Sequence, residues 1–130
     1  MPENIELEPL NIIFYEKEDG TKPAKEFIDS TDEKMHAKID TLLDMLSTRG
    51  RWLRMPYSRP LDEGIHELRA NFGSNASKVL YFFVFGNSAI ITNGFIKETQ
   101  KTPANELKKA KQYRRDYLNR LNNKEKNNNV

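Results

Sequence analysis

The chain has 130 residues, enough for one domain with a modest hydrophobic core. Charged residues make up 31% and hydrophobic residues 37%, as in a soluble globular protein, and the lack of cysteine excludes disulfides and Cys-based zinc sites within the chain. Two histidines are too few for a metal site by themselves, and neither a signal peptide nor a membrane span is evident, so we expect a cytoplasmic protein.

The charges are unevenly distributed along the chain. Residues 1–48 contain 12 acidic and 5 basic side chains, whereas residues 49–130 contain 7 acidic and 16 basic ones. A basic C-terminal part of this size favours a polyanionic partner, most commonly a nucleic acid. The alternative is that the two parts neutralise each other within the fold.

The N-terminal part predicts one strand followed by two helices. Residues 10–15 have the β-branched and aromatic content of a strand, and residues 22–28 predict a short helix with a proline in its first turn. Ser30 and Glu33 form a capping-box pattern that opens a second helix ending near Thr48. One apolar stripe along this helix predicts that the hairpin packs on a sheet: Met35, Ile39, Leu42, Leu43 and Leu46.

The connector at residues 49–63 places arginines next to aromatic residues. Two prolines argue against a continuous helix, and Gly50 is a suitable helix stop. A nucleic-acid surface uses guanidinium groups for phosphates and rings for base stacking. In the other interpretation, Trp52 and Leu53 anchor the loop to the core and the arginines are solvated. The residues concerned are Arg49, Arg51, Arg54, Arg59, Trp52 and Tyr57.

The stretch from residue 64 to 103 predicts three consecutive strands, near residues 66–69, 78–85 and 89–93. Short turns between them predict antiparallel neighbours. The resulting order is strand, helix, helix, three strands, helix. This order predicts an α+β domain, with a small, twisted, mainly antiparallel sheet packed against an N-terminal helical hairpin and a C-terminal helix on one side.

The C-terminal part predicts a helix over residues 103–121 that completes a single domain at residues 1–121. Residues 122–130 have a low-complexity polar composition that predicts a disordered tail. The apolar positions of the helix lie on one side: Leu107, Ala110, Tyr113, Tyr117, Leu118 and Leu121. Basic positions cover the other side, which is either simply solvated or in contact with RNA or an acidic partner: Lys108, Lys109, Lys111, Arg114 and Arg115.

The sheet directs several cations towards one region, which indicates phosphate chemistry. The candidate residues for catalysis are Arg69, Lys78, Lys97, Lys101 and Glu67, and those for binding RNA are Arg51, Arg54, Arg59, Lys108 and Arg115. Cations stabilise charge on a pentacoordinate phosphate, and a carboxylate can act as general base. Strand alternation puts His66 on the opposite face from Glu67, among core residues. Glu67 and Arg69 could instead be structural and form ion pairs with each other or with a neighbouring strand.

Three segments resemble the RelE/ParE toxin superfamily, and most closely its phage-derived HigB-like branch. They are residues 61–69 (LDEGIHELR), 78–81 (KVLY) and 94–103 (GFIKETQKTP), followed by Glu106. The resemblance covers residues 10–120. It implies the toxin of a type II toxin–antitoxin pair, an endoribonuclease that cleaves mRNA on the ribosome. The sequence offers no metal-ligand set, so we expect the cleavage to need no metal or other cofactor. It also implies a cognate helix-turn-helix, HigA-like antitoxin in a toxin–antitoxin hetero-oligomer.

The sequence departs from that branch at three positions. Many relatives have arginine where this chain has Lys78, histidine where it has Asn93, and a second lysine where it has Glu98. Two other hypotheses follow from the resemblance. The chain could be a ParE-like inhibitor that binds DNA gyrase, which would not need the basic cluster, or a degenerate member that keeps only antitoxin binding.

Overall fold

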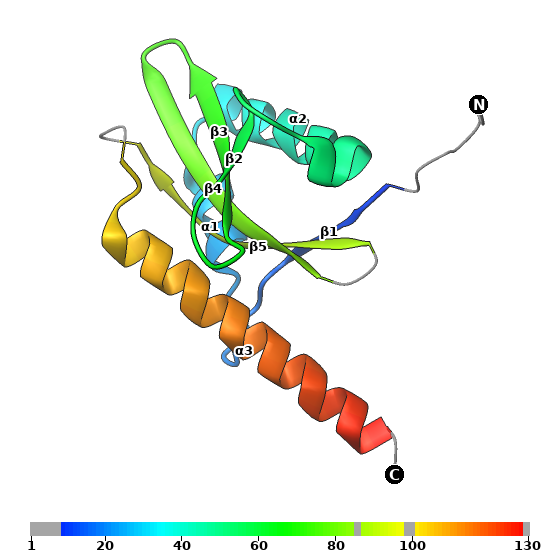
Figure 1. The fold of residues 1–130 in the computed structure, drawn as a ribbon. Coiled ribbons are helices and arrows are strands. Elements are labelled where there is room, and N and C mark those ends of the chain that lie inside the picture. Colours follow the sequence, from blue (N-terminus) through cyan, green and yellow to red (C-terminus); the bar gives the residue numbers. More distant parts are fainter. Residues whose placement is uncertain (1–8, 85–86, 98–100, 129–130) are drawn as a thin grey trace, which may run out of the picture.

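The computed structural model describes residues 9–84, 87–97 and 101–128 of the protein. Within these ranges, none of the helices has the apolar length needed to cross a bilayer. The elements follow one another as shown in Figure 1: β1 (Asn11–Phe14), α1 (Pro23–Ser30), α2 (Glu33–Arg49), the 3-10 turn η1 (Gly50–Trp52), β2 (Ser58–Pro60), β3 (His66–Phe72), β4 (Asn75–Val84), β5 (Ser88–Ile96) and α3 (Ala104–Asn128).

The five strands form one mixed sheet in the order β1-β5-β4-β3-β2. The predicted antiparallel pairing of β3, β4 and β5 is confirmed. Two features were not predicted: β1 pairs with β5 in parallel, and β2 forms inside the connector as an edge strand antiparallel to β3. Two parallel strands must be joined by a long crossover connection, and here the connection from β1 to β5 contains α1, α2 and the strands β2, β3 and β4. No short sequence motif could therefore predict this pairing.

The helices cover both faces of the sheet, which corrects the prediction that they lie on one side (Figure 1). The reason is that β3, β4 and β5 carry apolar side chains towards both faces, so each face needs a cover. The face towards α1 and α2 contributes Leu68, Ala70, Val79, Tyr81, Ala89 and Ile91. The face towards α3 contributes Leu80, Phe82, Ile90 and Phe95, together with Ile65 and Tyr15 beside the strands.

The N-terminal helices have the predicted extent but a different cap. Asp32, not Ser30, caps α2, and its carboxylate accepts a hydrogen bond from the Met35 amide at 2.8 Å. The Ser30 hydroxyl instead donates to the Phe27 carbonyl at the end of α1. Gly50 ends α2 with φ of 55°, as predicted.

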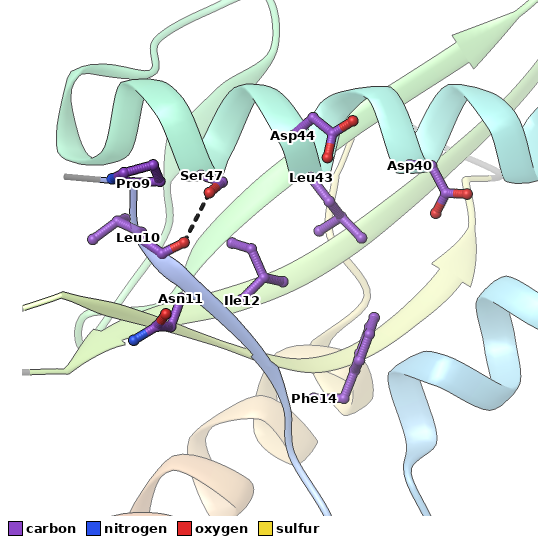
Figure 2. A pocket seen from close by; sticks show the side chains of 9 residues that line it. All are labelled: Pro9, Leu10, Asn11, Ile12, Phe14, Asp40, Leu43, Asp44 and Ser47. Carbon is purple, nitrogen blue, oxygen red and sulfur yellow. Dashed lines mark hydrogen bonds between the residues drawn. The ribbon is translucent and has the colours of Figure 1, made fainter. Parts of the chain in front are cut away.

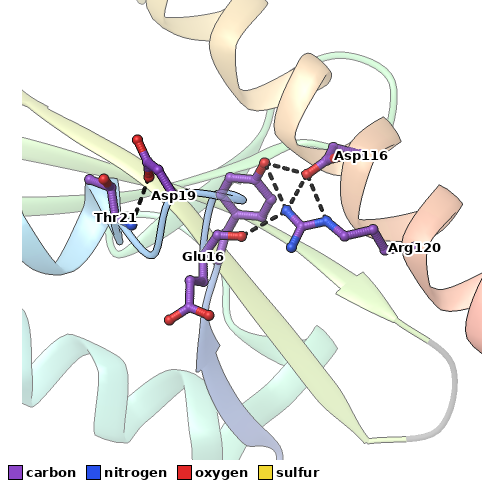
Figure 3. Close-up of polar contacts among 6 residues, drawn as sticks. Glu16, Asp19, Thr21, Asp116 and Arg120 are labelled. Carbon is purple, nitrogen blue, oxygen red and sulfur yellow. Dashed lines mark hydrogen bonds and ion pairs between the residues drawn. The ribbon is translucent and has the colours of Figure 1, made fainter.

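Helix α3 extends to Asn128, where the low-complexity composition predicted a disordered tail. A polar network joins this helix to the residue that follows β1 (Figure 3). The Tyr15 hydroxyl donates to Asp116 at 2.5 Å, and Arg120 pairs with Asp116 and donates to the Glu16 carbonyl at 2.7 Å. Burial and the hydrogen bond to Asp116 raise the pKa of Tyr15 to about 12. The contacts hold the long helix against the sheet.

Candidate functional site

Two cations on neighbouring strands and a third just after the end of β5 lie on the sheet face that α3 covers, near the start of that helix. Arg69 on β3 is directly opposite Lys78 on β4, which is in turn opposite Phe95 on β5. Directly opposed residues share a face, and Lys97 lies two positions beyond Phe95. The register therefore brings Arg69, Lys78 and Lys97 to one region of the α3 face.

A buried carboxylate lies at the centre of this region. Glu67 is 0% exposed and its Oε1 atom lies 2.8 Å from Nζ of Lys78, whose side chain is 1% exposed. The other oxygen accepts from Nε of Arg59 at 2.6 Å, and the Thr102 hydroxyl donates to Oε1 at 3.2 Å. The structural alternative is confirmed in one of its two forms: Glu67 pairs with the neighbouring strands β2 and β4, and not with Arg69.

The environment of Glu67 keeps it ionised. Burial is the strongest single influence and raises the pKa of the carboxyl, but the hydrogen bonds and charges of Lys78 and Arg59 outweigh it and hold the pKa below its ordinary value. A carboxylate engaged on both oxygens is a fixed counter-charge. It positions Lys78 and Arg59 and ties them to Thr102, just before α3.

A second buried polar contact joins β5 to α3. The Asn93 side-chain amide donates to the carbonyl and to the Oε1 atom of Glu106, both at 3.1 Å. Asn93 is 4% exposed, and its Oδ1 atom has no hydrogen-bond partner among the residues that the structure describes. Sequence reasoning assigned no contact to Glu106, although this residue belongs to the segments that carry the resemblance.

The remaining cations of the cluster are accessible. Arg69 is partly exposed, and within the described ranges its guanidinium donates only to the Met55 sulfur, at 3.3 Å. A thioether is a weak acceptor, so a phosphate would replace it readily. Lys97 is partly exposed and Lys101 is exposed. All three of these side chains are at least partly open to solvent.

Four of the five predicted binding residues lie outside the strands of the sheet. Arg51 and Arg54 are exposed at η1 and the turn after it, beyond the end of α2. Lys108 and Arg115 are exposed on α3. Of the five residues predicted to bind RNA, the structure brings only Arg59 into direct contact with Glu67.

His66 lies on the opposite face, as strand alternation predicted. Its ring stacks on Tyr81 at 5.3 Å between centroids and meets the edge of Phe83 at 5.1 Å. Burial, followed by the nearby charge of Arg51, lowers the pKa of His66. We therefore interpret His66 as a packed aromatic residue. Across residues 9–84, 87–97 and 101–128, no three acidic or histidine side chains gather to form a potential metal site.

A cavity of about 690 Å³ lies elsewhere, between β1 and α2 (Figure 2). Asp40 and Asp44 face it from the helix, and the Ser47 hydroxyl donates to the Leu10 carbonyl across one end at 2.8 Å. Its acidic lining does not suit a phosphate, and none of the clustered cations contributes to it. We therefore place the candidate site at the cation cluster.

The five-stranded mixed sheet with three helices forms a small α+β domain compatible with the RelE-like fold. Residues 26–115, more than two-thirds of the chain, match the model of the family described as Phage derived protein Gp49-like (DUF891). The protein belongs to this phage-derived, toxin-like family within the RelE-like superfamily of type II toxins. No curated protein matches the chain.

Proposed function

We propose that the protein is the toxin of a type II toxin–antitoxin system and cleaves mRNA on the ribosome without a metal. The observation that carries this proposal is the convergence of Arg69, Lys78 and Lys97 on one face of the sheet, organised by the buried Glu67. Membership of a toxin-like family supports it independently. A cognate helix-turn-helix antitoxin would neutralise the toxin in a hetero-oligomer.

The proposed reaction is a transesterification at one phosphodiester. The ribose 2′ oxygen attacks phosphorus, its proton passes to a base, and the bond to the 5′ oxygen breaks as that oxygen receives a proton. Arg69 stabilises the charge that develops on the phosphoryl oxygens. Glu67 is already engaged by Lys78, Arg59 and Thr102, so we assign it a positioning role in place of the base role that the sequence suggested.

Proton transfer then falls to the accessible amines. Lys97 follows the end of β5, and Lys101 precedes Thr102, whose hydroxyl contacts Glu67. In this mechanism, one of the two amines accepts the 2′ proton and the other donates a proton to the leaving 5′ oxygen. Both steps balance without a further reactant.

A reconstituted translation reaction tests the proposal, with mRNA cuts mapped by primer extension in the presence and absence of ribosomes. We compare the wild type with Arg69→Ala and with a Lys97→Ala/Lys101→Ala double variant, and use Lys17→Ala as a matched exposed-lysine control. We expect ribosome-dependent cuts that the first two variants lose and the control keeps. Cuts on naked RNA would refute the ribosome requirement. No cleavage by folded protein would refute the nuclease and direct attention to a DNA gyrase supercoiling assay.

A further inference from the structure

Trp52, the single tryptophan of the chain, is displayed on the surface. Its side chain is 72% exposed at the end of η1, whereas the next residue, Leu53, is 6% exposed and packs in the core beneath α2. Only half of the anchoring interpretation of this loop is therefore right. Leu53 holds the loop to the core, and in doing so it presents the indole to solvent.

Three arginines lie within three residues of Trp52 in the sequence, and their guanidinium groups have no acidic partner among the residues that the structure describes. Arg49 lies over the Tyr57 ring at 5.8 Å, and Arg51 lies over the Phe83 ring at 4.4 Å. Arg54 donates to the Arg51 carbonyl at 2.8 Å. None of the three forms an ion pair within the described parts of the chain. A guanidinium that lies over a ring, like those of Arg49 and Arg51, is oriented by the ring and keeps N–H donors available for anions.

A cavity adjoins the indole. Its volume is about 170 Å³, and it is lined by Leu10 and by the chain from Ser47 to Trp52, including Arg49 and Arg51. The cavity therefore combines an aromatic wall, an apolar side chain and two cations. A planar, uncharged ring attached to a phosphate matches this combination.

The same loop leads from Trp52 to the candidate catalytic face. Beyond the buried Leu53, the Met55 sulfur accepts from Arg69, and Arg59 bonds to Glu67 on the α3 face. The connector thus passes around the β2 edge of the sheet. A ligand strand lying along it would meet basic side chains from Trp52 to the cation cluster.

We propose that Trp52 and its neighbouring arginines bind an unstacked nucleotide of the RNA strand whose cleavage is proposed above. The base stacks on the indole over the 170 Å³ cavity, while Arg49, Arg51 and Arg54 bind flanking phosphates. This inference rests on the proposed function, because it takes RNA as the substrate. It adds a second contact point, on the other side of the sheet edge from the reacting phosphate.

The emission of the single tryptophan tests the inference directly. The wild-type protein is titrated with a single-stranded 2′-O-methyl RNA octamer, which cannot undergo the transesterification, while Trp52 fluorescence and the anisotropy of a labelled octamer are followed. We expect quenching that saturates together with the anisotropy and weakens with added salt. Trp52→Ala should weaken binding by roughly 5- to 150-fold, Trp52→Phe by much less, and Arg54→Ala should reduce the salt dependence.

The controls separate this inference from the nuclease proposal. Phe72→Ala removes another exposed aromatic ring, at the end of β3, and should leave the affinity unchanged. Saturating anisotropy without quenching would refute the inference, because the RNA would then bind elsewhere. Equal affinity for a uridine mononucleotide would refute a strand-binding role. Either result would refute Trp52 binding even if the protein cleaves mRNA on the ribosome. Conversely, octamer binding at Trp52 could be observed even if no ribosome-dependent cleavage occurs. The two proposals are therefore refuted by different measurements.

Discussion

Substitution of Glu67 by glutamine tests whether this buried carboxylate organises the site. Glu67→Gln keeps the shape of the side chain but removes the negative charge 2.8 Å from the buried Lys78 ammonium. Removing one partner of a buried ion pair typically costs about 3–5 kcal/mol. The unfolding entropy of a 130-residue chain is about 270 cal/mol/K, so we expect the melting temperature to fall by about 11–18 °C.

Circular dichroism melts at neutral pH measure this loss, with Glu18→Gln as the control at an exposed position. A double variant, Glu67→Leu with Lys78→Met, removes both buried charges and should recover much of the stability. A fall of less than about 3 °C in Glu67→Gln would refute the reasoning, since one kcal/mol corresponds to about 4 °C here. A double variant less stable than the single one would refute it equally.

The stabilisation that Glu67 provides should also depend on pH in a predictable direction. The folded pKa of Glu67 is depressed, so its stabilisation is complete above the pKa of an unfolded glutamate, about 4.3, and is lost as the pH falls through the folded pKa. The difference in melting temperature between wild type and Glu67→Gln should therefore narrow below about pH 4. A constant difference down to acid unfolding would contradict the assignment.

Three further predictions concern positions outside the cluster. Gly94→Ala places a methyl group 2.4 Å from the Phe27 ring and should cost about 1–3 kcal/mol in urea unfolding, whereas a neutral result would contradict the close contact. Asp32→Ala should cost about 1 kcal/mol through loss of the α2 cap, and Ser30→Ala much less; the reverse order in thermal melts would restore Ser30 as the cap. The pKa of Tyr15, raised to about 12, means that stability falls as the pH rises above about 10. Tyr15 should ionise near pH 12 by phenolate absorbance, and Tyr15→Phe should reduce the amplitude of the high-pH titration, to which Tyr81, whose pKa burial also raises, contributes too.

The site could be anticipated in part from the sequence. Alternation along β3 correctly separated His66 from Glu67 and Arg69, because the two faces of a strand follow a strict period of two. The concentration of cations after residue 49 was also visible. The sequence allowed Glu67 to pair with a neighbouring strand, but it did not identify Lys78 and Arg59 as the partners, because the strand register is set by turns and packing.

Elements that depend on local chemistry were determined by the sequence itself. The apolar stripe of α2, its stop at Gly50 and the consecutive β3, β4 and β5 all appear as predicted, because helix periodicity, a left-handed C-terminal residue and short turns act over a few residues. Even the cap of α2 lay within two residues of its predicted place.

Only the tertiary structure decided how these elements combine. The parallel pairing of β1 with β5, the covering of both sheet faces and the burial of the Lys78 ammonium each depend on segments far apart in the chain. Trp52 makes the same point at the surface, since its sequence neighbourhood suited either a buried anchor or an exposed ring. Leu53 packs in the core with the residues of α2, and the neighbouring Trp52 is exposed to solvent. Because a protein core is close-packed, its composition depends on the tertiary arrangement and not on the sequence of one loop.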